Sequence, residues 1–218
     1  MSISASMVKE LRERTGAGML DCKKALAENS DNIEAAIDWL RAKGITKAAK
    51  KAGRAATEGA VVSYIHAGGK IGVLVEINSE TDFVARTDNF QDLCKDIAMH
   101  IAAAAPEFVS RDEVDADSVE RERQVQLQRV LDEGKPEHIA EKIVEGRMGK
   151  WFEEVCLLDQ KFVKADDGKT VGQLLTDAVA TIGENIRIRR FNRFVLGEGL
   201  EKKSDDFAAE VAAQAGLN

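Results

Sequence analysis

A short apolar stretch, followed by a polar connection and an amphipathic segment, limits the fold of this chain more than any other feature. Residues 72–77 read Gly-Val-Leu-Val-Glu-Ile, and so short a run of apolar, largely β-branched residues is typical of a buried strand. Thr87 can cap the helix that follows. The apolar positions of that helix recur at helical spacing and are Phe90, Leu93, Cys94, Ile97 and Ile101. The sequence therefore predicts a strand and a helix that pack together, joined by residues 78–86.

Four residues of this connection, Thr81, Asp82, Phe83 and Val84, have two interpretations. A connection between a strand and a helix can hold side chains toward a partner, because the scaffold behind it is rigid. In the alternative, a local staple, Phe83 packs under its own helix and Asp82 accepts backbone N–H bonds. The pattern alone favours the local staple and leaves both interpretations open.

Residues 3–42 are predicted to form three short amphipathic helices. Residues 15–18, Thr-Gly-Ala-Gly, end the first helix, because glycine adopts turn conformations at little cost. Asp31 and Glu34 form a capping-box pattern at the start of the third. Three helices in so few residues make a bundle near the lower size limit for independent folding. Such a small bundle is expected to serve as a docking piece.

A β-hairpin with a covering helix is predicted next, from strands at 61–65 and 71–77 and a helix at 87–105. A second helical pair follows. Gly134 suits the left-handed end of a helix and Pro136 suits a first turn, so residues 119–152 are predicted to form an antiparallel helical hairpin.

The remaining segments are predicted to be strands at 155–158 and 162–163, a helix at 171–182, a strand at 185–196 and a helix at 204–215. In the strand at 185–196, side chains alternate between two faces. The residues of one parity predict a core face and are Ile186, Ile188, Phe194 and Leu196. The residues of the other parity predict a mixed face and are Arg187, Arg189, Phe191, Arg193 and Val195.

These elements predict an α+β fold. Its parts are an N-terminal three-helix docking module (1–43), a mobile, partly helical linker (44–60), an α+β core with an antiparallel sheet (61–118 and 153–199), an inserted helical-hairpin coiled coil (119–152) and a C-terminal helix (200–218).

Charge and composition restrict the partners. The net charge is −7, whereas nucleic-acid-binding domains need a basic face, so no direct contact with nucleic acid is expected. Residues 1–54 carry a net charge of +4, which could meet an acidic protein surface or keep a small module soluble. No apolar run approaches the roughly 18 residues that cross a membrane, and the N-terminus lacks a signal-peptide core. We expect a cytoplasmic protein.

No motif for catalysis, a metal or a cofactor is found. The sequence lacks a phosphate-binding glycine loop, an HExxH motif and a Cys/His array, so we expect a protein that is not an enzyme and needs no cofactor. Three widely separated cysteines are expected to be buried thiols, and are Cys22, Cys94 and Cys156. His100 lies on the apolar side of its helix and is by default a satisfied, partly buried side chain.

Four segments, in the same order, closely resemble the bacterial translation elongation factor Ts family. They are VKELRERTGAGMLDCKKAL at 8–26, ETDFVAR at 80–86, IVEGRMGKW at 143–151 and DFAAEVAAQ at 206–214. The resemblance covers essentially the whole chain. It implies a guanine-nucleotide exchange factor of elongation factor Tu with a UBA-like N-terminal bundle, and it reverses the preference between the two interpretations of the connection.

The resemblance also implies roles for individual residues. Asp82 and Phe83, shaped by Thr81 and Val84, would push toward the nucleotide and Mg²⁺ site of the GTPase, and His100 would lie near its phosphate-binding loop. The residues that match the docking surface of the N-terminal module are Arg12, Met19 and Leu20, although other members often have methionine where Leu20 stands.

The length of the chain resembles the short form of the family, which implies a homodimer, with residues 186–196 a candidate for the contact. A second hypothesis remains, in which the chain is a non-catalytic scaffold that binds a partner through its three-helix module without affecting nucleotide.

Overall fold

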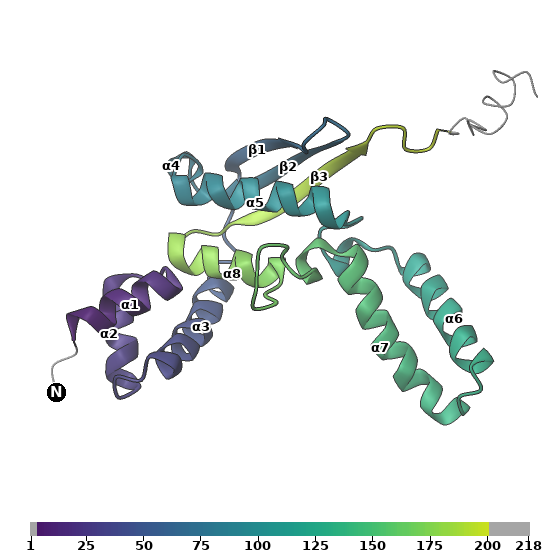
Figure 1. The fold of residues 1–218 in the computed structure, drawn as a ribbon, viewed down its shortest axis with the longest axis horizontal. Coiled ribbons are helices and arrows are strands. Elements are labelled where there is room, and N and C mark those ends of the chain that lie inside the picture. Colours follow the sequence, from purple (N-terminus) through teal and green to yellow (C-terminus); the bar gives the residue numbers. More distant parts are fainter. Residues whose placement is uncertain (1–3, 201–218) are drawn as a thin grey trace, which may run out of the picture.

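The computed structural model describes residues 4–200 of the 218-residue chain and has an α+β fold (Figure 1). Its helices are α1 (Ala5–Thr15), α2 (Met19–Glu28), α3 (Ile33–Ala49), α4 (Asp82–Ala85), α5 (Asp88–Ala104), α6 (Ala116–Asp132), α7 (Glu137–Val155) and α8 (Val171–Ile182), with 3-10 turns η1 (Arg111–Glu113) and η2 (Leu157–Asp159). Its strands are β1 (Glu58–Ile65), β2 (Ile71–Ser79) and β3 (Arg187–Val195), and they form an antiparallel sheet in the order β1-β2-β3. The helix predicted at 204–215 lies outside the described residues.

Helices α1, α2 and α3 pack around a small core of their own, which comprises Leu11, Cys22, Ala25, Leu26 and Ala36. Gly16 ends α1 in the left-handed conformation (φ 66°). The capping box predicted from Asp31 and Glu34 is wrong, because Asp31 adopts a left-handed conformation (φ 60°) in the turn after α2. Asn32 caps α3 instead, and its side chain accepts the N–H of Ala35 at 3.0 Å.

Helix α3 continues to Ala49, so the segment predicted to be a mobile, partly helical linker begins inside a helix. The alanine- and lysine-rich sequence has a high helix propensity, and α3 packs against α8. A Cβ atom at Gly44 would lie 3.3 Å from the Cβ atom of Ala180, which shows how closely the two helices approach. Beyond α3, the Asn185 side chain donates to the carbonyl of Arg54 at 2.7 Å. These contacts fix the segment on the core.

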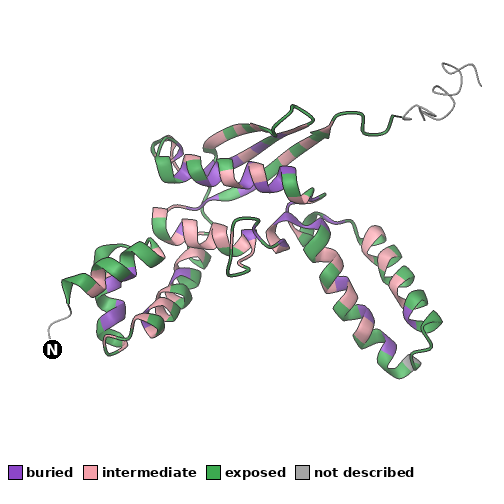
Figure 2. Ribbon diagram, viewed as in Figure 1, coloured by how far each residue is buried: buried purple, intermediate pink, exposed green. Residues whose placement is uncertain are grey.

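The hairpin β1–β2 and the helix α5 form as predicted, and α5 covers one face of the sheet (Figure 1). Thr87 caps α5 by accepting the N–H of Phe90 at 3.4 Å. Buried residues occur along the whole length of α5, as Figure 2 shows. The main core is built from the sheet, α5, η2 and α8, and its buried side chains include Val73, Val75, Ile77, Phe90, Ile97, Ile101, Leu157 and Val171.

A β-bulge interrupts the pairing of β2 with β3. Ile77 pairs with Ile188, whereas Glu76 pairs with Arg190, so Arg189 is an extra residue in β3. A bulge of this kind leaves one residue unpaired and turns the side chains that follow to the opposite face of the sheet.

The predicted faces of the last strand are therefore wrong after Ile188. Phe191 packs on the core, although its parity puts it on the mixed face. Phe194 and Leu196, which share parity with Ile188, lie on the face of the sheet opposite α5, which we call the bare face, and are 64% and 76% exposed.

The strands predicted at 155–158 and 162–163 are also wrong. Val155 ends α7, and the residues that follow form the 3-10 turn η2. Two isolated bridges, Phe108 with Cys156 and Lys161 with Thr170, are the β pairing that the structure gives this segment. Leu157 and Phe162 are buried in the main core without a neighbouring strand, whereas Val163 is 48% exposed. A short apolar run indicates burial and does not by itself show that a strand pairs there.

Helices α6 and α7 form an antiparallel hairpin that projects from the core at the end away from the bundle (Figure 1). Gly134 takes the left-handed conformation (φ 73°) in its turn, as predicted, and Pro136 is the N-cap of α7. The hairpin has a separate small core of Val130, Ala140, Val144 and Met148. Among the helices at residues 4–200, each is too short or too polar to span a bilayer.

Candidate functional site

The candidate site is the single-turn helix α4 and its cap, and we call Thr81, Asp82, Phe83 and Val84 the tip. Thr81 caps α4 by accepting the N–H of Val84 at 3.4 Å. Val84 and the neighbouring Ala85 pack on the hydrophobic core below the sheet. Phe83 faces the other way and is 78% exposed, so its ring is directed to solvent from a turn that is anchored behind it.

The local-staple interpretation is therefore wrong for both of its residues. Phe83 does not pack under α5, because Val84 and Ala85 fill that position. The carboxylate of Asp82 accepts a bond from the side chain of Arg86 at 2.7 Å rather than from backbone N–H groups. Arg86 is itself exposed and the Asp82 side chain is 47% exposed, so the carboxylate and the ring of Phe83 are both accessible at the surface.

Hydrogen bonds with one residue distant in sequence and with one near neighbour hold Thr81. The carboxylate of Glu184, in the connection between α8 and β3, accepts the Thr81 N–H at 3.0 Å and the Thr81 hydroxyl at 2.7 Å. Ser79 donates its hydroxyl to the carbonyl of Thr81 at 2.9 Å. Glu184 could not be identified from the sequence, because no local pattern links two residues that are 103 positions apart.

His100 lies on α5 and is fully buried. Its Nδ1 atom accepts the N–H of Val163 at 3.3 Å, and its Nε2 atom lies 3.0 Å from the side-chain oxygen of Gln160. Burial lowers the pKa of His100 from its ordinary value, and the bond to Gln160 acts in the opposite direction. The structure therefore places this ring in the core, and does not bring it to the surface beside the tip.

Arg12, Met19 and Leu20 are exposed on the N-terminal bundle. Met19 is 60% exposed and Leu20 is 85% exposed, although both are large apolar side chains. Figure 1 places the bundle and α4 at the same end of the core, opposite the hairpin of α6 and α7. Exposed apolar side chains of this kind mark a surface that can bind another protein.

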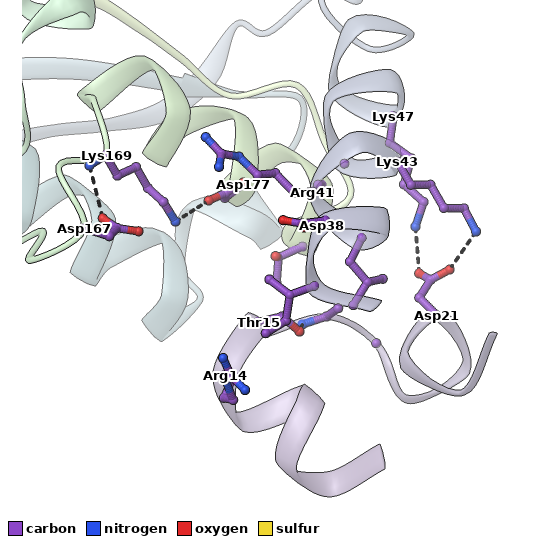
Figure 3. Close-up of a pocket in the computed structure, with 17 residues that line it drawn as sticks. Arg14, Thr15, Asp21, Asp38, Arg41, Lys43, Lys47, Asp167, Lys169 and Asp177 are labelled. Atoms are coloured by element: carbon purple, nitrogen blue, oxygen red, sulfur yellow. Dashed lines mark hydrogen bonds and ion pairs between the residues drawn. The ribbon is translucent and has the colours of Figure 1, made fainter. Parts of the chain in front are cut away.

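A cleft of about 250 Å³ between the bundle and α8 is shown in Figure 3. On the bundle side, Asp21 accepts bonds from Lys47 at 2.7 Å and from Lys43 at 3.4 Å. Lys47 is the main reason why the pKa of Asp21 is lower than its ordinary value. On the core side, Lys169 pairs with Asp177 at 2.7 Å. No residue of the tip lines this cleft, so the candidate site does not include it.

The described residues hold no group of three His, Cys, Asp or Glu side chains arranged to bind a metal ion. The three cysteines are free and buried, and burial raises the pKa of the Cys94 thiol to about 12 and is the main cause that raises that of Cys156 to about 11. Thiols of this kind are poor nucleophiles at neutral pH. The groups that the tip exposes for binding are the ring of Phe83 and the carboxylate of Asp82.

Comparisons with known proteins identify the family. The family model described as Elongation factor TS matches residues 6–178. Elongation factor Ts of Geobacter sulfurreducens is 63% identical over 217 residues, which are 100% of each chain. Elongation factor Ts of Desulforamulus reducens is 64% identical over 212 residues, or 97% of each chain, and that of an Anaeromyxobacter species is 63% identical over 215 residues, or 99% of this chain and 98% of the relative. This chain belongs to the elongation factor Ts family.

Proposed function

We propose that this protein is the guanine-nucleotide exchange factor of elongation factor Tu and acts in the cytoplasm during translation elongation. The observation that carries the proposal is the tip, where an exposed aromatic ring and a carboxylate stand on a turn anchored to the core. Membership of the elongation factor Ts family supports the same conclusion. No covalent step is needed, so the protein acts without being an enzyme in the usual sense.

The physical mechanism follows from how a GTPase holds GDP. The diphosphate and its Mg²⁺ are bound as one network of charges, so a group that displaces part of the ion's shell weakens all of these contacts together. In the proposal, Phe83 and Asp82 enter the GTPase near this site, with Thr81 and Val84 shaping the turn. By linkage, this protein and the nucleotide lower each other's affinity for the GTPase by the same factor. Exchange is then promoted in both directions.

A second surface would dock the GTPase. We propose that residues 1–43 form a UBA-like docking module that uses Arg12, Met19 and Leu20. The exposure of these three side chains supports this role. A direct contact between His100 and the GTPase would require its bonds to Gln160 and Val163 to open, because in this structure the ring joins α5 to the segment after η2.

We also propose that two copies of the chain associate, and that the contact is the bare face of the sheet. The exposed apolar side chains on this face come from all three strands and the residue after β3, and are Val61, Ile65, Leu74, Phe194 and Leu196. A second sheet could cover them, because sheets pack face to face through their apolar side chains. The hairpin of α6 and α7, a proposed coiled coil, would remain free to make further contacts.

The test is the release of labelled GDP from elongation factor Tu, measured with and without this protein. The exchange factor accelerates release, and the variant with both Asp82→Ala and Phe83→Ala does so much less. A protein that binds elongation factor Tu without accelerating release would instead be the scaffold of the second hypothesis. Binding is measured in parallel by sedimentation, so the two outcomes are distinguished in the same samples.

A further inference from the structure

Two connections next to the tip are joined by two reciprocal hydrogen bonds, and each connection supplies the carboxylate for one of them. Glu184 accepts the backbone N–H of Thr81 at 3.0 Å, and Glu80 accepts the backbone N–H of Asn185 at 2.6 Å. Each glutamate therefore binds the residue that follows the other one in sequence. We call these four residues, Glu80, Thr81, Glu184 and Asn185, the loop clamp.

The two halves of the loop clamp have different additional partners. Glu80 also lies 3.5 Å from the guanidinium of Arg54, so part of its charge is balanced by a cation. Glu184 forms no ion pair with a described Lys or Arg, and both of its oxygens are bound by Thr81. A carboxylate that accepts two bonds from one residue fixes the direction of that residue, because both bonds depend on its orientation.

The bond to the Thr81 hydroxyl sets the start of α4. A threonine hydroxyl has one proton, and the 2.7 Å contact with Glu184 directs that proton to the carboxylate. The oxygen lone pairs are then free to accept the N–H of Val84, at 3.4 Å. Ser79 holds the carbonyl of Thr81 at 2.9 Å. The cap of α4, and with it the direction of Phe83, therefore depends on a residue outside the tip.

We propose that Glu184 is a positioning residue for nucleotide exchange, acting through Thr81. This inference rests on the proposed function of the tip. Without the carboxylate, Thr81 loses the acceptor for two donors, and α4 loses the orientation of its cap. The docking surface on the N-terminal bundle is unchanged, so the loss affects the rate of release within the complex and not the formation of the complex.

The experiment measures GDP release from elongation factor Tu over a range of concentrations of the full-length protein. Glu184→Ala lowers the maximal rate about tenfold, which corresponds to about 1.4 kcal/mol of activation free energy, and leaves the half-saturating concentration within about twofold. Glu184→Gln keeps one acceptor oxygen and gives an intermediate rate. Thr170→Ala, which removes the cap at the other end of α8, is the matched control and keeps the wild-type rate.

A double-mutant cycle tests whether Glu184 acts through Thr81. Thr81→Val lowers the maximal rate by itself, and adding Glu184→Ala lowers it by much less than the product of the two single effects. Circular dichroism and thermal melting confirm that each variant is folded.

The results separate the inference from the proposed function. If the wild-type protein accelerates release and Glu184→Ala accelerates it equally, the inference is wrong while the proposed function stands. Equal losses in Glu184→Ala and Thr170→Ala, or multiplicative effects in the cycle, also overturn the inference. If the wild-type protein does not accelerate release, the proposed function is wrong, and the positioning role is lost with it.

Discussion

The Nε2 atom of His100 lies 3.0 Å from the side-chain oxygen of Gln160, inside the core and 60 positions away in sequence. Because the Nδ1 atom accepts the N–H of Val163, the ring proton is on Nε2 and the imidazole is neutral in the folded protein. Burial lowers the pKa of His100, so the folded state resists protonation where an exposed histidine would accept a proton.

We therefore expect stability to fall as pH decreases below about 6.5, the ordinary pKa of histidine. In that range the unfolded chain binds a proton that the folded chain does not bind, so the free energy of unfolding decreases until the pH reaches the lowered pKa. Between pH 7.5 and 5.5, the wild type loses up to about 1 kcal/mol more than His100→Gln. Urea unfolding of both proteins at the two pH values measures the difference. Parallel pH dependences would show that His100 binds a proton as readily in the folded state as in the unfolded chain.

Phe83→Ala is expected to reduce GDP release from elongation factor Tu at least about tenfold, because it removes the ring that we propose enters the partner. The ring is 78% exposed, so its removal changes the free energy of unfolding by less than about 0.5 kcal/mol. Val125→Ala, at an exposed apolar position on α6, is the control and leaves release unchanged. A large loss of stability in Phe83→Ala would mean that the ring packs on the protein in solution.

Phe194→Asp is expected to dissociate the proposed homodimer, because a charge would be buried against the apolar face of the second sheet. The dissociation constant rises about 100-fold or more, which is about 2.7 kcal/mol. Analytical ultracentrifugation measures the change from twice the chain mass of 23.8 kDa to the chain mass itself. Val125→Asp, on the hairpin, is the control and stays dimeric. A wild-type protein that is monomeric at every concentration contradicts the proposal.

Gly59→Ala is expected to destabilise the protein by at least about 2 kcal/mol. Gly59 lies in β1 at φ 128°, and an added Cβ atom would lie 2.1 Å from the carbonyl oxygen of Ile77. Gly53→Ala is the control, since a Cβ atom there meets nothing within 4 Å. Urea unfolding measures both variants, and equal stabilities would show that β1 can shift to make room.

Much of the fold could be predicted because its signals are local. A few neighbouring residues are enough to predict the hairpin, the cap of α5 at Thr87 and the end of α8 at Gly183. The full extent of α3 could not be predicted, because its second half is held by α8 and not by an apolar pattern of its own. Tertiary packing of this kind leaves no periodic signal.

The site was predicted less completely than the fold. Its position at the connection followed from the strand and helix on either side, but the direction of Phe83 did not, because both interpretations satisfy the same pattern. Val84 and Ala85 decide between them by filling the space that the ring would occupy. Glu184 was missed because its interaction with Thr81 depends on how α8 and β2 are placed in three dimensions.

The extra residue at Arg189 has a consequence for how genes of this family diverge. A codon deleted at that point would leave a regular strand, with Phe191 still opposite Val75 on the core face and Phe194 still outside. A codon deleted after Phe191 would instead turn Phe194 inward, together with every second residue beyond it. Deletions should therefore be tolerated at the bulge and be rare in the rest of this strand.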